Sequence, residues 1–233
     1  MSGATAAPAP LLRRYAAWSL DAVAIGVVTI ALLHRRLSDG LQTCMRTVDA
    51  LFQTMAALMQ RTLDLADAPV ALLQAWMADP TLKVAMTALT VAVTSLVLTT
   101  MIGFALVSLV WFTAFEGARW QATPGKRLLG LRVVDDDGLA PGFVRSALRN
   151  AAGLLSWLSL NIGHLLAARA PRHQTLHDRI AGTRVVLHDP APMPLVARLW
   201  LTLQPAACFF VLALLMRALD QRLTAALDAT LGL

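Results

Sequence analysis

The residue most able to carry chemistry is Asp21, which lies within the apolar run 15–33. A charge near the centre of a membrane helix costs roughly 2.5 to 3.5 kcal/mol on insertion scales, so a partner must offset it. Arg14 precedes Asp21 by two helical turns on the same face, with the small Ala17 between them, but it lies about 10 Å away along the axis. The expected donors to Asp21 are therefore Arg149, Asn150, Arg179 or the hydroxyl groups of Thr87, Thr90, Thr94, Ser95 and Thr99.

Two roles fit an acidic residue at this depth. In one, Asp21 is a structural anchor, hydrogen-bonded or protonated, that fixes the register of its helix. In the other, it binds and releases H⁺ or Na⁺, because intramembrane carboxylates often mark ion pathways. The sequence leaves both roles open.

The segment TPGKRLLG begins at Thr123 and invites comparison with a phosphate-binding loop. It lacks a glycine five residues before Gly125 and a Ser or Thr after Lys126, which excludes that assignment. Thr123, Pro124 and Gly125 instead predict a tight turn, with Lys126 and Arg127 at the lipid headgroups.

The segment HQTLHDRIAGTRVV places His173 and His177 four residues apart, with Asp178 adjacent. No third ligand follows at a recognisable spacing, so neither a metal nor another cofactor is expected. We expect Asp178 to pair with an arginine or to cap a backbone turn, and His177 to donate to a carbonyl. No nucleophile–histidine motif supports catalysis, and the sequence predicts no catalytic residue and no enzyme activity.

The composition predicts an integral membrane protein. The 233 residues are 57% hydrophobic and 15% charged, with a formal net charge of +6, which is too apolar for a soluble domain. The basic residues flank apolar segments instead of forming a basic domain. This pattern excludes nucleic acid as a partner and favours a lipid bilayer with anionic headgroups.

Several elements must position these residues. Amphipathic helices are expected where apolar residues recur every three or four positions, at 41–65 and in the tail 220–233, and the two are expected to pack together. The apolar segments that could enter a bilayer are 15–33, 84–115, 143–168, which polar residues interrupt, and 199–216, which Pro205 would kink.

Two similar segments, GLRVVDDDG at 130–138 and GTRVVLHDP at 182–190, each predict a short strand followed by a turn. Pairing with each other would satisfy their backbone groups and would place both on one side of the membrane. The segment between them would then be a re-entrant helical hairpin. Thirteen of the twenty Lys and Arg residues would lie on that side, which makes it and the N-terminus cytoplasmic. The alternative is four simple spans with the strands on opposite faces.

Three motifs together resemble the RDD family of bacterial membrane proteins. They are RRYAAWSLD, TPGKRLLGLRVVDDDG, and ALRN followed by QTLHDRIAGTRVV, within about residues 11–188. The resemblance implies that Arg14 and Asp21 correspond to the family's arginine and first aspartate, and Asp178 to the second. It also implies transport of a ligand that is not identified, with sodium/proton antiport suggested for some members.

We therefore expect an all-α membrane protein with three to four transmembrane helices, a re-entrant helical hairpin, amphipathic helices and a small cytoplasmic two-stranded β element. Its expected parts are a flexible leader (1–12), the RDD-like membrane domain (13–190) with an amphipathic insertion (38–80), and an additional transmembrane helix with an amphipathic tail (191–233). The expected location is the bacterial inner membrane, with several spans.

The expected function is transport of a cation (Na⁺ or H⁺) or a small solute through a charge-paired intramembrane site. The alternative is a non-catalytic scaffold or assembly factor that binds a partner protein or lipid through its amphipathic helices. Either role favours a homo-oligomer or a partner membrane protein. The site residues are expected to be Arg14, Asp21, Arg149 and Asp178, supported by His177, Asn150, Thr123, Gly125 and Lys126.

Overall fold

Most of the chain is helical. The computed structural model describes residues 7–62, 68–158, 166–168, 173–188 and 191–231. Three helices are long and apolar enough to cross a membrane, namely α1 (Leu11–Arg61), α3 (Pro80–Gly117) and α8 (Leu195–Leu231). They expose large apolar side chains such as Val27 (62%), Val110 (69%) and Phe209 (75%), and a bilayer is the solvent that such surfaces need. The expected class, a mostly helical multi-pass membrane protein, is confirmed.

α1 is longer than the sequence predicts, because it joins the first apolar run to the amphipathic stretch in one helix of 51 residues. No proline separates the two parts, and the single Gly40 between them costs only about 1 kcal/mol in a helix interior. Gly40 also allows close packing, since a Cβ there would lie 3.0 Å from the Cδ1 atom of Leu96 on α3. In the same way α8 continues through Pro205 into the tail.

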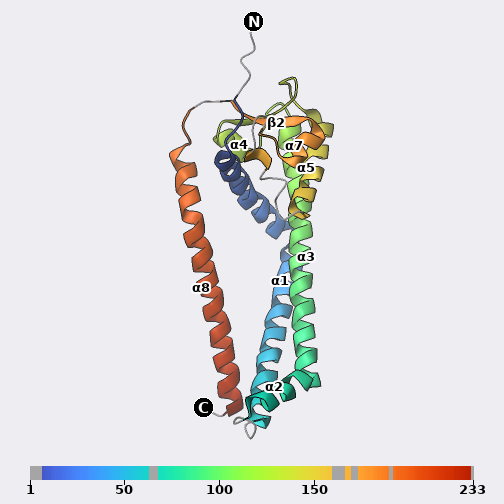
Figure 1. Cartoon of the computed structure of the whole chain (residues 1–233), viewed down its shortest axis with the longest axis vertical. Helices are drawn as coiled ribbons and strands as arrows, with labels where there is room; N and C mark the ends of the chain where they lie inside the picture. Colours follow the sequence, from blue (N-terminus) through green and yellow to red (C-terminus); the bar gives the residue numbers. More distant parts are fainter. Residues whose placement is uncertain (1–6, 63–67, 159–165, 169–172, 189–190, 232–233) are drawn as a thin grey trace. The chain divides into compact units, whose positions relative to one another are not determined.

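The chain forms two compact units. We call residues 1–32 and 102–204 the sheet unit, and residues 33–101 and 205–233 the helical unit. In the helical unit, α2 (Pro69–Ala78) lies beside the end of α1 (Figure 1), and the Trp76 indole donates to Thr62 Oγ1 over 3.1 Å. Arg222 Nη1 donates to Asp49 Oδ1 over 2.6 Å, so the tail packs on the amphipathic part of α1 as expected.

The sheet unit contains a two-stranded antiparallel sheet of β1 (Leu131–Asp135) and β2 (Thr183–Leu187). The predicted pairing of the two similar segments is therefore confirmed. Paired strands share one face, so the alternative with the strands on opposite faces is not compatible with this sheet, and the side of the membrane on which the sheet lies stays a prediction. Residues 7–9 of the expected flexible leader lie along β2, where Ala9 N donates to Val185 O over 3.2 Å.

Three short helices surround the sheet and the start of α1 (Figure 1). They are α4 (Pro124–Leu128), α5 (Gly142–Leu158) and α7 (Leu176–Ala181), with a 3-10 turn η2 (Leu166–Ala168) between the last two. α5 has 17 residues and is not among the three candidate spans of the described chain. The turn of the expected re-entrant hairpin, residues 159–165, lies outside the described residues.

The buried core of the sheet unit joins α1 to the sheet. Ala16 and Ala17 of α1 are fully buried against Leu129, Leu131 and Val133. Small side chains on α1 let the loop and strand approach its backbone closely, which is how small residues act in membrane helix packing. This contact places the start of α1 next to α4.

Candidate functional site

The carboxylate of Asp21 is held by the start of α4. Thr123 Oγ1 donates to Asp21 Oδ2, and the backbone N–H of Gly125 donates to Asp21 Oδ1 over 2.9 Å. Thr123 is also the N-cap of α4, where its Oγ1 accepts from the N–H of Lys126. Asp21 is 2% exposed, so these two donors take the place of water.

The donors that the sequence suggested for Asp21 are wrong. Among the described residues, Thr123 and Gly125 donate to its carboxylate, and Arg149, Asn150 and Arg179 do not. Two of the hydroxyl groups suggested from the second apolar helix have other acceptors. Thr87 and Thr90 donate to carbonyl oxygens one turn earlier in α3, because that acceptor is always within reach inside a helix.

Gly125 is required by the closeness of α1. A Cβ at this position would lie 2.3 Å from Ala17 O and 2.9 Å from Asp21 Cγ. The small residue at Ala17 predicted a close neighbour, and that neighbour is the first turn of α4. The segment beginning at Thr123 therefore forms a capped helical turn that binds the Asp21 carboxylate.

Glu116, at the end of α3, is a fully buried acceptor for three donors. It accepts from Lys126 Nζ, from Arg149 Nη1 over 2.5 Å and from Asn150 Nδ2 over 3.3 Å. Its neighbour Gly117 permits the approach of α5, since a Cβ there would lie 2.8 Å from Phe143 Cα. Glu116 thereby connects α3, α4 and α5.

Asp178, at the start of α7, is the second buried acceptor. Arg149 Nε donates to its Oδ1 over 2.8 Å, and Arg14 Nη1 donates to its Oδ2 over 3.3 Å. The same carboxylate accepts from the backbone N–H of Thr175 and completes a capping box at the start of α7. Both expectations for Asp178, an arginine partner and a cap, are confirmed.

His177 lies beside this pair. Its Nε2 atom is 3.4 Å from Arg149 Nη2 and 3.9 Å from Asp178 Oδ1. The imidazole therefore contacts the guanidinium, and its expected donation to a carbonyl stays a prediction.

These residues form one line of alternating charges, which we call the charge chain: Arg14, Asp178, Arg149, Glu116 and Lys126. Three cations and two carboxylates give it a charge of +1, and an ionised Asp21 beside Lys126 brings the group to zero. Of the three carboxylates Asp21, Glu116 and Asp178, only Asp21 forms no ion pair with a Lys or Arg among the described residues.

Burial and neighbouring charges shift the pKa values of those charge-chain residues that lie outside the spanning helices. Burial alone raises the pKa of Asp178, but Arg149, His177 and Arg14 reverse this and hold the pKa well below its ordinary value. Burial lowers the pKa of Arg149, and Glu116 and Asp178 more than compensate, so its pKa lies above the ordinary value. Burial lowers the pKa of Lys126, and Glu116 offsets this only in part.

Two features of the site differ from the sequence analysis. Lys126 was expected at the headgroup surface, yet it is 6% exposed and faces Glu116, because Thr123 turns the chain inward. Arg127 is exposed as expected. Glu116 was missed, although it is the only glutamate in the chain and lies at the end of an apolar helix, and that isolation was the available signal.

Among the described residues, no three His, Cys, Asp or Glu side chains converge as a metal site. The arrangement is suited to holding a balanced set of charges at the end of spanning helices. It also leaves one carboxylate, Asp21, that accepts hydrogen bonds but forms no ion pair with a Lys or Arg among the described residues.

Comparisons with known proteins identify the family of the chain. A family model described as "RDD family" matches residues 8–182, a range that contains Asp21 and the whole charge chain. The uncharacterized protein YxaI of Bacillus subtilis (strain 168) is 33% identical over 89 residues, which are 38% of this chain and 58% of that protein. The match therefore spans less than two thirds of this curated relative. No solved structure matches. Because the family match covers most of the chain and every charged residue of the site, the protein belongs to the RDD family.

Proposed function

We propose that this RDD family membrane protein moves a small cation, H⁺ or Na⁺, across the bilayer, and that Asp21 is the carboxylate that exchanges it. The observation that carries the proposal is the difference between Asp21 and the other two buried carboxylates. Glu116 and Asp178 each accept from two cationic side chains, whereas in the described chain Asp21 accepts from a hydroxyl and a backbone N–H.

This difference decides which carboxylate can exchange a cation. Neutralising Glu116 or Asp178 would leave buried arginine or lysine charges uncompensated, which is strongly destabilising. Neutralising Asp21 removes a buried charge that has no direct ionic partner, so the cost of binding a cation is smallest there.

Cation binding at Asp21 would also change the contact between α1 and the start of α4. A protonated Asp21 becomes a donor at one oxygen and can no longer accept from both Thr123 Oγ1 and Gly125 N in the same way. Both donors begin α4, which carries Lys126 of the charge chain. Loss of the Asp21 contact would therefore reach Glu116 through α4, and this link couples occupancy of the site to the packing of α3.

The orientation completes the proposal. We place the paired strands and the N-terminus in the cytoplasm, at the face that would hold thirteen of the twenty Lys and Arg residues, and we assign the protein to the bacterial inner membrane. Three spans are too few to enclose a pathway, so a homo-oligomer or a partner membrane protein is part of the proposal.

Flux in proteoliposomes tests the transport proposal. Asp21→Asn should abolish Na⁺ or H⁺ flux, because the side chain keeps its size and loses its ionisable group. Asp49→Asn is the matched control, since it removes the same group from the helical unit. Wild-type Na⁺ and H⁺ flux equal to that of empty vesicles, or full activity of Asp21→Asn, would overturn the proposal.

A second candidate function is a scaffold or assembly factor. The observation that favours it is the long continuation of α1, which is held by the tail through Asp49 and Arg222 and forms a ready-made surface. Deletion of residues 41–66 should then abolish complex formation in gentle detergent, while Asp21→Asn should change only stability. Purification without partner or self-association would remove this candidate.

A further inference from the structure

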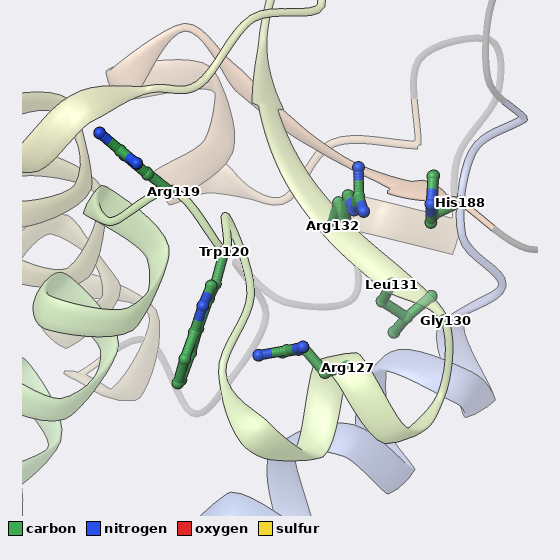
Figure 2. A pocket seen from close by; sticks show the side chains of 7 residues that line it. All are labelled: Arg119, Trp120, Arg127, Gly130, Leu131, Arg132 and His188. Atoms are coloured by element: carbon green, nitrogen blue, oxygen red, sulfur yellow. The ribbon is translucent and has the colours of Figure 1, made fainter.

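A pocket of about 180 Å³ lies in the sheet unit, and its lining shares no residue with the charge chain or Asp21. It is formed where the chain leaves α3, by α4, by the start of β1 and by His188, which follows β2. The side chains that give it chemical character are Arg119, Trp120, Arg127, Arg132 and His188 (Figure 2).

The pocket is strongly positive. Three guanidinium groups line it, and none of its described lining residues carries a carboxylate. Within the described chain, the Lys and Arg ion pairs involve Arg14, Lys126, Arg145, Arg149 and Arg222, so the charges of the three lining arginines are not neutralised in this way. Cations gathered without a counter-charge favour binding of an anion.

One of these cations is held in place by aromatic rings. The guanidinium of Arg127 lies 4.5 Å from the centre of the Trp120 ring, and Trp120 stacks on Phe115 of α3 at 5.7 Å. Figure 2 shows the Arg127 side chain directed toward Trp120. A guanidinium over an aromatic face keeps its N–H groups free at the edge, where they can bind an anion at reduced entropic cost.

We propose that this pocket binds a phosphate group. The planar guanidinium fork matches the oxygens of a phosphate and binds them in bidentate fashion, and several arginines provide the charge that a phosphate mono- or diester requires. This binding is separate from cation exchange at Asp21 and holds whether or not the protein is a transporter.

The phosphate has two possible sources, a lipid headgroup and a soluble phosphate ester. The position of the pocket brings headgroups within reach, because Arg119 and Trp120 follow within three residues of Gly117, the last residue of the apolar helix α3. Tryptophan and arginine at the end of a span lie at the level of lipid phosphates. A phosphate ester in solution would reach the same side chains, because all three arginines are exposed.

The test uses the full-length protein in a non-ionic detergent free of phospholipid. Calorimetric titrations measure binding of inorganic phosphate and glycerol phosphate in one arm, and of phosphatidic acid in mixed micelles in the other. The variant is Arg127→Gln with Arg132→Gln, and each single change is also titrated. The control is Arg35→Gln with Arg36→Gln, which removes the same charge from exposed positions of α1.

We expect the pocket variant to weaken binding about tenfold or more in at least one arm, as loss of charge-assisted hydrogen bonds requires, while the control binds like wild type. An effect confined to phosphatidic acid assigns the pocket to lipid headgroups, and an effect on the soluble compounds assigns it to a phosphate ester. Equal binding by the pocket variants and the control in both arms would overturn the proposal.

Discussion

Replacing Glu116 by Gln tests whether the charge chain holds the sheet unit together. The substitution keeps the volume and removes a fully buried charge that accepts from Lys126 Nζ and, over 2.5 Å, from Arg149 Nη1. The new amide N–H₂ would also face one of these two donors. Breaking a buried ion pair by removing one partner costs about 3 to 5 kcal/mol, and we expect a loss of unfolding free energy in that range.

The exposed ion pair of the helical unit provides the control. Asp49 and Arg222 have side chains that are 43% and 34% exposed, and such a pair contributes about 0.2 to 1 kcal/mol. Asp49→Asn should therefore cost far less than Glu116→Gln. Both variants are measured by denaturant unfolding in mixed detergent micelles, where differences between variants are compared under one condition.

A double variant separates charge balance from packing. Glu116→Gln with Lys126→Gln removes one carboxylate and one cation, so the charge chain keeps its balance. We expect the double variant to lose less stability than the sum of its single changes, since directly contacting residues couple by about 0.5 to 3 kcal/mol. A Glu116→Gln cost no larger than that of Asp49→Asn, or strict additivity in the double variant, would refute the reasoning.

Further predictions concern the close contact of α4, the acid limb of stability and the side of the strands. Gly125→Ala should lower the thermal unfolding midpoint, because its Cβ would lie 2.3 Å from a backbone oxygen of α1, whereas Gly153→Ala, where the space is open, should not. Neighbouring arginines hold the pKa of Asp178 low despite burial, so the stabilisation by its carboxylate is present at neutral pH and is lost as the pH falls below about 4. The difference in unfolding free energy between wild type and Asp178→Asn should therefore become smaller in acid. A difference that does not change with pH would contradict this. Single cysteines at 137 and 188, placed in a cysteine-free background, should react with an impermeant reagent from the same side, and labelling from opposite sides would exclude the paired sheet.

The elements that follow from local patterns were predictable from the sequence. Apolar length gave the three spanning helices, and two similar segments with turn residues gave the strands and their pairing. The double role of Asp178 was also predictable, because capping depends on residues only three positions apart. Local patterns could not predict that a helix continues through a weak helix breaker such as Gly40.

The partners in the site depended on distant contacts. Asp21 and its donor Thr123 are 102 residues apart, and nothing near either residue specifies the other. Lys126 was expected at the surface because lysines usually are exposed, and the buried carboxylate that reverses this preference lies on another helix. Glu116 was not predicted as a site residue, because a single acidic residue at the end of an apolar helix also fits a position at the membrane interface.

Infrared difference spectroscopy on Asp21 tests the central claim most directly. Reconstituted protein labelled with ¹³C-aspartate is compared with Asp21→Asn while the pH or the Na⁺ concentration is changed. If Asp21 exchanges a cation, wild-type protein shows a carboxyl band that shifts with pH or Na⁺ and is missing from the variant. Identical difference spectra for wild type and Asp21→Asn would mean that Asp21 keeps one state throughout, and its role would then be that of a structural anchor for α4.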